Sequence, residues 1–356
     1  MEKYLNPWIK KIKARNVVPQ KPENSVDLFI GESPYPPSPK VLKTIAEHSC
    51  KINRYPDYKA VAVKERLADY CNVTSEQIIV GNGSDELIDI IIKVFVGQSE
   101  EVIVPIPTYF SFWRSTLIRG GRPIFVNRTN NFDIDVNLLQ KAMSPKTKVL
   151  YIPNPNNPTC NIISRKVIID ILDKMDCMVV IDECYYEYSQ FTVTDLIDKY
   201  DNLIILRSLS KGFGLAGVRI GYAIGNAQII DYLHRAVTMY PVNSLAQAAA
   251  IAALQDQDYT KANIKKIRQD REFLAREIEK LGFIVYPSQC NFLFIRTEPL
   301  GLVGETIVEA LKANNIFVQD LGLRPGLDEY YFRTAIGTPD DNHILLENLK
   351  KISDRS

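Results

Sequence analysis

The sequence predicts an α/β protein whose sheet is mostly parallel and carries helices on both faces. Short runs rich in Val and Ile alternate along the chain with longer segments of helical period. The short runs are apolar throughout, which is typical of strands that are buried on both faces. The predicted strands are residues 77–80, 101–104, 148–152, 178–181 and 203–206, and two of the connecting helices are residues 87–96 and 167–175.

The pattern changes after about residue 240, and the 356 residues are enough for two domains. Residues 261–281 are highly charged but place apolar side chains at helical spacing, which predicts a solvated amphipathic helix. Residues 5–12 show the same kind of spacing and predict a short amphipathic helix near the N-terminus. The runs after residue 281 predict a small α+β domain with strands at 283–286, 292–295, 316–319 and 331–336 and a helix from about residue 303.

Composition and charge give no reason to expect nucleic acid or a membrane as a partner. Lys and Arg total 43 and Asp and Glu total 42, so the formal net charge is +1. No run approaches the ~20 apolar residues of a membrane span, and the first residues are too polar for a secretion signal. The six cysteines and three histidines lack the spacing of a metal site. We therefore expect a cytoplasmic protein with free thiols and no metal.

Polar residues follow the predicted strands, and doubly wound sheets bind ligands at the carboxyl ends of their strands. Residues 81–86 (GNGSDE) open a helix and suit a phosphate, although a capped tight turn explains them at least as well. Tyr109 follows the next strand, and a packed surface ring explains it better when it is taken alone. Residues 153–159 (PNPNNPT) hold three prolines and three asparagines, so a binding loop and a plain turn are equal alternatives.

Two further strand ends carry groups that suit one kind of cofactor. Asp182 follows the strand at 178–181, and a carboxylate there is costly unless a cation such as a pyridinium nitrogen meets it. Lys211 follows the strand at 203–206 between hydroxyls and glycines, and Arg219 comes shortly after it. This pattern favours a Schiff-base amine beside a bound phosphate, although Lys211 alone could be an ordinary solvated lysine.

Several stretches match a known family when they are taken together in chain order. They are Pro34–Pro36, Arg54–Pro56, Asn154–Thr159, Ser208–Tyr222 and Val242–Ala250. In these stretches the chain resembles the fold-type-I aminotransferases that use pyridoxal 5′-phosphate, most closely the histidinol-phosphate aminotransferase branch. The resemblance covers nearly the whole chain and is most specific around Lys211. It implies a large cofactor-binding domain at 31–245 and a small domain made of 1–30 and 246–356.

The resemblance also implies roles for residues at the cofactor. Lys211 would form the Schiff base, and Asp182 would keep the pyridinium nitrogen protonated so that the ring withdraws electrons. Tyr185 and Asn157 would hydrogen-bond the 3′-oxygen of the ring, and Tyr109 would stack on its face. The residues expected at the cofactor phosphate are Ser84, Asp85, Ser208, Ser210 and Arg219. Lys211, Asp182 and Tyr185 are thus the expected catalytic residues.

The substrate side matches the family less well. Arg333 matches the arginine that binds the substrate's carboxylate or phosphate, and Tyr35 is also expected at the substrate. Gln319 stands where the family commonly has a second substrate-binding arginine, so the candidate replacement is Arg324. Tyr55 matches a tyrosine that reaches the cofactor of the neighbouring subunit, which implies a homodimer with shared active sites.

The activity implied by the resemblance is a transamination that depends on pyridoxal phosphate. The donor would be a small phosphorylated, aromatic or imidazole amine of the histidinol-phosphate type, and the acceptor would be 2-oxoglutarate. Residues 326–333 also resemble the amino-acid O-phosphate decarboxylases, so decarboxylation by a threonine-phosphate decarboxylase-like enzyme is the alternative. A regulatory protein on a degenerate domain is disfavoured, because Lys211 and Asp182 are both present.

Overall fold

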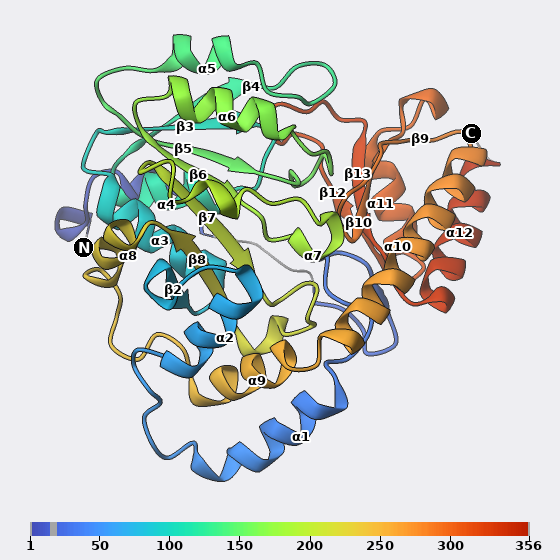
Figure 1. The fold of residues 1–356 in the computed structure, drawn as a ribbon. Helices are drawn as coiled ribbons and strands as arrows, with labels where there is room; N and C mark the ends of the chain where they lie inside the picture. The colour runs from blue at the N-terminus through green and yellow to red at the C-terminus, as the bar shows by residue number, and fades with distance from the viewer. Residues whose placement is uncertain (1, 15–19, 355–356) are drawn as a thin grey trace.

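The computed structural model describes residues 2–14 and 20–354 and has the predicted α/β architecture (Figure 1). Within these ranges, the central sheet has seven strands in the order β2-β8-β7-β6-β5-β3-β4. Their bounds are β2 Ile78–Gly81, β3 Glu101–Ile106, β4 Arg122–Asn127, β5 Thr147–Pro153, β6 Met178–Asp182, β7 Leu203–Ser208 and β8 Gly221–Gly225. The five strands predicted in this region are all present.

Helices cover both faces of the sheet because its strands point apolar side chains to both sides. In β6, Val179 and Ile181 belong to one core cluster and Val180 belongs to the other. Helices α2, α5, α6 and α9 close the first cluster, and α3, α4 and α8 close the second. The bounds are α1 Pro39–His48, α2 Val61–Cys71, α3 Ser84–Phe95, α4 Ser111–Arg119, α5 Val136–Ala142, α6 Arg165–Lys174, α7 Tyr186–Ser189, α8 Ala227–His234 and α9 Ser244–Leu254.

Strands β4 and β8 have no counterpart in the sequence prediction. β8 begins and ends with glycine and follows β7 through a loop without a crossover helix, so the chain returns antiparallel. β2 is antiparallel to β8 in turn, which makes β2 parallel to β7, and Gly81, Gly221 and Ser208 lie in register. The other neighbouring pairs are parallel. The carboxyl ends of β2, β3, β5, β6 and β7 therefore meet at one edge.

A second, smaller unit surrounds a sheet of strands in the order β12-β13-β10-β9. Its elements are α10 Gln257–Lys280, β9 Ile284–Val285, β10 Phe292–Arg296, α11 Gly304–Lys312, β11 Ile316–Phe317, β12 Gln319–Asp320, β13 Tyr331–Ala335 and α12 Pro339–Ser353. The predicted strand at 316–319 is thus two short strands. β1, Val26–Asp27, pairs in parallel with β11, and Leu28 packs in the core of this unit. The connector before α1 therefore joins the small unit. None of the helices in the described ranges is long and apolar enough to cross a membrane.

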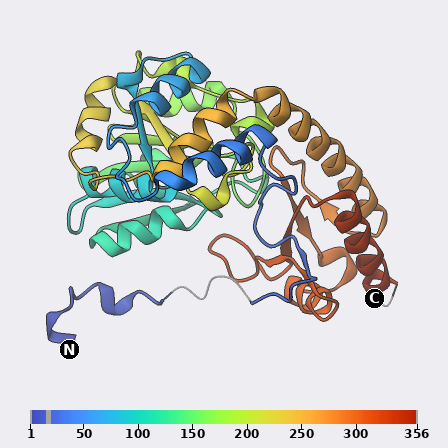
Figure 2. The same ribbon diagram turned by 90° about the horizontal axis from the view of Figure 1, so that it is seen from below.

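Helices α9 and α10 mark the change from one unit to the other. α9 packs against α1 and α2, and its alanines belong to a core cluster of the large sheet. α10 is 24 residues long and reaches from the large unit into the small one (Figure 2). We therefore propose the discontinuous two-domain division expected from the sequence, with its boundary after α9 rather than at residue 245.

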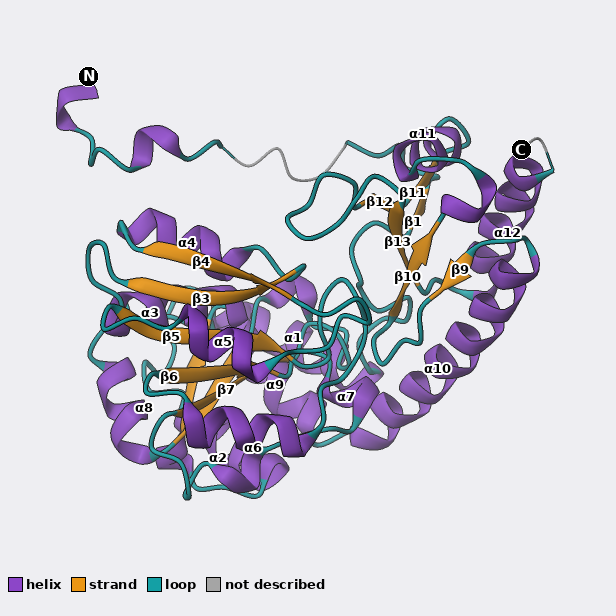
Figure 3. Cartoon of the chain, turned by 90° about the horizontal axis from the view of Figure 1, so that it is seen from above, coloured by secondary structure: helices purple, strands orange, loops and turns teal. Residues whose placement is uncertain are grey.

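The predicted amphipathic helix at residues 5–12 is wrong. Two separate 3₁₀ turns, Glu2–Tyr4 and Ile9–Lys11, are present instead. Pro7 lies between them, and a proline inside a helix removes a hydrogen-bond donor and clashes with the preceding turn. Trp8 contacts α4, where its Nε1 donates to the carbonyl of Ile118 at 2.9 Å. This segment thus contacts α4 of the large unit (Figure 3), whereas the expected domain division places it with the small domain.

Candidate active site

A cavity of about 380 Å³ lies at the edge where the strand ends meet, between the large sheet and the small unit. It brings together nearly all of the residues that the sequence singles out. Those that line it are Ser84, Asp85, Tyr109, Asn157, Asp182, Tyr185, Ser208, Ser210, Lys211, Arg219, Gln319, Arg324 and Arg333. Of the predicted residues, Tyr35 and Tyr55 lie outside this lining.

Lys211 and Asp182 give the cavity an amine without a hydrogen-bond partner and a carboxylate without a cation among the described residues. The Lys211 amine makes no hydrogen bond or ion pair with any described residue, and burial together with the charge of Arg333 lowers its pKa. Asp182 accepts hydrogen bonds from the backbone N–H of Cys184 at 3.0 Å and from the hydroxyl of Tyr151. Burial raises the pKa of Asp182 even though these bonds oppose the rise. In the described part of the chain, no cation pairs with this carboxylate.

The start of α3 and the side chain of Arg219 form a cradle for an anion. α3 begins at Ser84, so its first backbone N–H groups have no acceptor within the helix. A Cβ atom on Gly83 would lie 2.5 Å from Nη2 of Arg219, and the φ of 81° at Gly83 also favours glycine. Ser208 and Ser210 add hydroxyls from the end of β7. Free N–H groups, a guanidinium and hydroxyls are the donors that bind phosphate.

Asn157 and Arg333 connect the two units across the cavity. Oδ1 of Asn157 accepts a hydrogen bond from Nη1 of Arg333 at 2.8 Å, and Nη2 donates to the carbonyl of Phe29 at 3.1 Å. Tyr109 lies on the large-domain side, where its hydroxyl donates to Oδ1 of Asp85 at 3.0 Å. The cavity therefore has walls from both units and from the connector before α1.

Residues 23–349 match the family model of the class I and II aminotransferases. The chain belongs to this family. The histidinol-phosphate aminotransferase of Methanococcus aeolicus is 35% identical over 337 residues, which are 93% of this chain and 91% of that protein. A further relative, the histidinol-phosphate aminotransferase of Thermoanaerobacter sp., is 36% identical over 325 residues, 90% of this chain and 91% of that protein.

Solved structures share the fold. The histidinol-phosphate aminotransferase of Sinorhizobium meliloti, in complex with pyridoxal-5′-phosphate, has a TM-score of 0.90 at 24% identity and covers 99% of this chain and 98% of its own. The L-threonine-O-3-phosphate decarboxylase of Porphyromonas gingivalis has a TM-score of 0.79 at 23% identity, covering 92% and 100%. The protein is thus an aminotransferase of the pyridoxal phosphate-dependent type, with an amine donor and a 2-oxo acid as substrates.

The aminotransferase cavity fits pyridoxal phosphate at three separate points. No cation of residues 2–14 and 20–354 meets the buried carboxylate of Asp182, which suits a pyridinium nitrogen. The Lys211 amine has a lowered pKa and no partner in the same ranges, which suits an aldehyde. The cradle at Gly83 and Arg219 suits the phosphate. These groups come from different strand ends, so a ligand must span them to satisfy all three.

The substrate side of the aminotransferase cavity belongs to the small domain. Gln319 in β12 pairs with Arg333 in β13. Burial and the charge of Arg333 lower the pKa of Arg324 to about 10, and neither arginine has a carboxylate partner among the described residues. Tyr35 lies elsewhere, with its ring 5.1 Å from Nζ of Lys266. Its contact with substrate stays a prediction.

Some contributors to the aminotransferase site escaped the sequence reasoning. Phe29 and Ile30 line the cavity from the connector beside Gly31 and Glu32, and no local pattern marks Phe29 and Ile30, because folding of the small domain brings them there. Cys184 lines the cavity and donates its N–H to Asp182. Tyr151 holds Asp182 from within β5, and a tyrosine in a strand of aliphatic residues is a signal that could have marked it.

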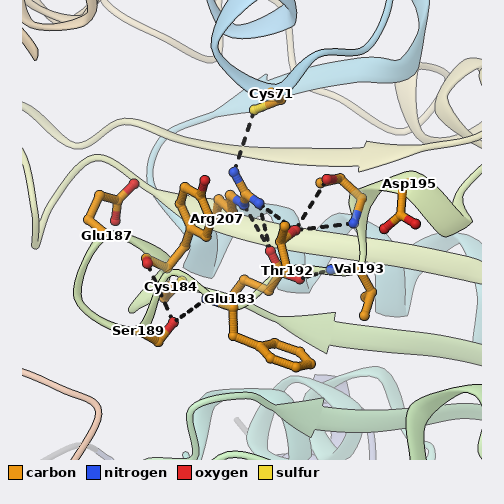
Figure 4. A network of polar contacts seen from close by, with 12 residues as sticks. Cys71, Glu183, Cys184, Glu187, Ser189, Thr192, Val193, Asp195 and Arg207 are labelled. Atoms are coloured by element: carbon orange, nitrogen blue, oxygen red, sulfur yellow. Dashed lines mark hydrogen bonds and ion pairs between the residues drawn. The ribbon is translucent and has the colours of Figure 1, made fainter. Parts of the chain in front are cut away.

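Behind the cavity, Glu183 and Arg207 form a buried ion pair (Figure 4). Nη2 and Nε of Arg207 lie 2.8 and 3.0 Å from Oε2 of Glu183, and Nη2 also donates to Thr192 at 2.7 Å. Glu183 follows Asp182 in the chain, and Arg207 precedes Ser208. The ion pair therefore connects the ends of β6 and β7 at positions next in sequence to Asp182 and Ser208, which line the site.

Glu187 is a second buried carboxyl group behind the site, and no cation of the described residues pairs with it. Its side chain is 2% exposed, and its Oε1 accepts a hydrogen bond from Tyr70 at 3.3 Å. Oε2 has no partner among the described residues, and Figure 4 draws no contact from this carboxyl group to Arg207. Its Cβ and Cγ lie 2.6 Å from where a Cβ would stand on Gly212. Burial raises the pKa of Glu187 to about 7, against the charge of Arg207.

Because of this raised pKa, Glu187 should make the protein less stable as the pH rises. The unfolded chain releases the proton near the ordinary value of 4.5 and the folded chain only near 7. The stability that the protonated Glu187 side chain contributes is thus fully present below pH 4.5. It is lost between pH 4.5 and pH 7 and amounts to roughly 3 kcal/mol at most. Glu187→Gln, which cannot ionise, should gain on the wild type by about 2 kcal/mol between pH 5 and pH 8. Urea unfolding at both pH values measures the difference, and an equal difference at both would contradict the raised pKa.

Proposed function

We propose that this aminotransferase transfers the amino group of a small phosphorylated amine, of the histidinol-phosphate type, to 2-oxoglutarate. The observation that carries the proposal is the presence of Arg324 and Arg333 in one cavity, neither with a carboxylate partner in the described ranges. Two such guanidinium groups require an anion, and a phosphate or a pair of carboxylates supplies it. The histidinol-phosphate aminotransferases among the relatives support a donor of this class.

Lys211 and Asp182 have the central roles in the proposed reaction. Pyridoxal phosphate, when bound, supplies a ring that withdraws electrons from the substrate Cα. Lys211 would hold the cofactor through its amine, and the freed amine would move a proton at the substrate Cα. Its lowered pKa favours the neutral amine that this base needs. Asp182 holds a proton on the ring nitrogen from the end of β6.

The other residues of the large domain orient the cofactor. Tyr185 and Asn157, which line the cavity, would hydrogen-bond the 3′-oxygen of the ring, and Tyr109 would stack on the ring. The phosphate is bound by the first turn of α3 at Ser84 and Asp85 together with Ser208, Ser210 and Arg219. Because Asn157 also accepts a hydrogen bond from Arg333, the cofactor ring and the substrate anion are positioned by one pair of side chains.

On the substrate side, we assign different anions to the two arginines. Arg333 is fixed by Asn157 and by the carbonyl of Phe29, so it is suited to the group next to the reacting carbon. Arg324 is suited to the distal phosphate or carboxylate, in place of the arginine that Gln319 replaces. Gln319 can add a hydrogen bond but no charge.

The test compares a donor with and without its phosphate. Histidinol phosphate should be a much better donor than histidinol for the wild type, and Arg324→Met should reduce this preference by roughly 10- to 100-fold, because a charge-assisted pair is lost. Gln319→Arg should strengthen binding of the phosphorylated donor. Initial rates of glutamate formation from 2-oxoglutarate, taken over a range of donor concentrations, measure the preference of the wild type, the preference of Arg324→Met and the KM of Gln319→Arg for the phosphorylated donor.

An unchanged preference in Arg324→Met would overturn the assignment of Arg324. Release of CO₂ from an amino-acid O-phosphate, without nitrogen transfer to 2-oxoglutarate, would instead support the decarboxylase alternative.

We also propose that the enzyme is a homodimer in which Tyr55 reaches the neighbouring subunit's site. Tyr55 is 80% exposed and stacks on Tyr240, with ring centroids 4.5 Å apart. Ile52, Tyr58 and Met239 are exposed as well. An exposed apolar surface of this kind is typical of a subunit interface.

A further inference from the structure

Arg128 is a buried arginine outside the cavity lining that the proposed mechanism does not use. It follows β4, and no ion pair joins it to a carboxylate among the described residues. Burial lowers its pKa to about 10, so the guanidinium is still charged at neutral pH. A buried charge without an ionic partner is expensive and is retained only where its hydrogen bonds matter.

On one side, Arg128 binds the loop that carries Asn157. Its Nη2 donates to Oδ1 of Asn156 at 3.1 Å, and this oxygen also accepts a hydrogen bond from Thr108 at 3.1 Å. Nδ2 of Asn156 donates to the carbonyl of Pro107 at 3.0 Å. Asn156 precedes Asn157, and Thr108 precedes Tyr109. Arg128 therefore contacts the loop of Asn157 directly and reaches the loop of Tyr109 through Asn156, and both loops carry proposed cofactor contacts.

On the other side, Arg128 binds the backbone at Phe132, whose ring packs in the small-domain core. Nη1 of Arg128 donates to the carbonyl of Phe132 at 3.2 Å, and Asn161 donates to the same carbonyl at 3.0 Å. Phe132 has a φ of 61°, an uncommon conformation for a residue other than glycine. Its ring centroid lies 5.4 Å from those of both Tyr286 and Phe294. Arg128 thus joins the large-domain loops to the small domain.

We propose that Arg128 is a positioning residue that fixes the Asn157 and Tyr109 loops relative to the small domain that carries Arg333. The inference rests on the proposed cofactor contacts of Asn157 and Tyr109. Arg333 donates to Asn157 directly, so a shift of the Asn156–Asn157 segment displaces the substrate anion site as well as the cofactor contact. Arg128 acts through these neighbours and touches neither cofactor nor substrate.

Arg128→Met tests the proposal in the holoenzyme by two measurements. Loss of the guanidinium should lower kcat by at least about ten-fold, since a misplacement of 1 Å can cost up to about 10²-fold. It should also move the pH midpoint of the bound cofactor's visible absorbance, because Asn157 contacts the ring oxygen. Arg122→Met is the matched control: Arg122 is an exposed arginine at the start of β4, and both measurements should stay at wild-type values.

Two further variants separate positioning from a loss of folding. Arg128→Lys keeps a buried charge but has a single nitrogen to reach both acceptors. It should move the pH midpoint of the cofactor absorbance in the same direction as Arg128→Met but by a smaller amount. Phe132→Ala leaves the bond from Arg128 to Asn156 and should raise KM for the donor while the midpoint stays unchanged. Wild-type midpoint and kcat in both Arg128 variants would overturn the proposal. The absorbance titration needs no substrate, so an error in the proposed donor leaves it readable.

Discussion

Replacing Lys211 by alanine is expected to reduce transamination by at least about 10⁴-fold, since the group that moves the proton at the substrate Cα is then missing. The variant should still bind pyridoxal phosphate, because the cradle at Arg219 and the carboxylate of Asp182 are intact. Turnover of the donor against 2-oxoglutarate measures the loss, and the visible spectrum reports the bound cofactor. A variant with wild-type turnover would show that Lys211 has no part in the chemistry.

The Lys211→Ala variant also tests whether Tyr55 of one subunit contributes to the active site of the neighbouring subunit. In a mixed dimer of Lys211→Ala and Tyr55→Phe chains, one site has neither substitution, because its Lys211 and its Tyr55 come from different chains. An equal mixture after subunit exchange should therefore recover up to about a quarter of wild-type activity. If activity never exceeds the mean of the two parents, Tyr55 acts within its own subunit or not at all.

Glu183→Gln is expected to cost about 3–5 kcal/mol of stability, because it leaves the charge of Arg207 buried without its partner. Arg207→Met should be similarly costly. The double variant should lose clearly less than the two single losses added together, since neither charge of the pair is then left buried without its partner. Urea unfolding at pH 7 of the four proteins gives the coupling energy.

A surface ion pair provides the matched control for this cycle. Arg165 and Asp195 form a bidentate pair, and their side chains are 40% and 65% exposed. Asp195→Asn should cost less than about 1 kcal/mol. If the losses at Glu183 and Arg207 were simply additive, the buried pair would not act as a unit.

The strand ends of the large domain could be predicted from the sequence because each lies beside a long apolar run. Asp182 and Lys211 follow such runs directly, and parallel strands bring their carboxyl ends to one edge. β8 escaped prediction because its five residues begin and end with glycine, and its direction depends on the short return from β7.

The rest of the site depends on contacts between segments far apart in the chain. Residues 29–32 reach the cavity only because β1 pairs with β11, and Arg324 enters it from a loop of the small domain. The role of Arg128 could not be predicted from the sequence either. It follows a strand of mixed polar and apolar residues, and its partners, Asn156 and the carbonyl of Phe132, come close to it only when the loops pack together. Local patterns therefore located the cofactor chemistry better than the substrate contacts.

The close packing of Glu187 on Gly212 constrains how the segment around the catalytic lysine can change over evolutionary time. Any side chain at position 212 would collide with Cβ and Cγ of Glu187, so even alanine is barred there. A smaller residue at 187 such as alanine removes Cγ but keeps the Cβ, and only glycine removes both atoms. Position 212 can therefore accept a side chain only after position 187 has become glycine or the backbone between them has moved apart.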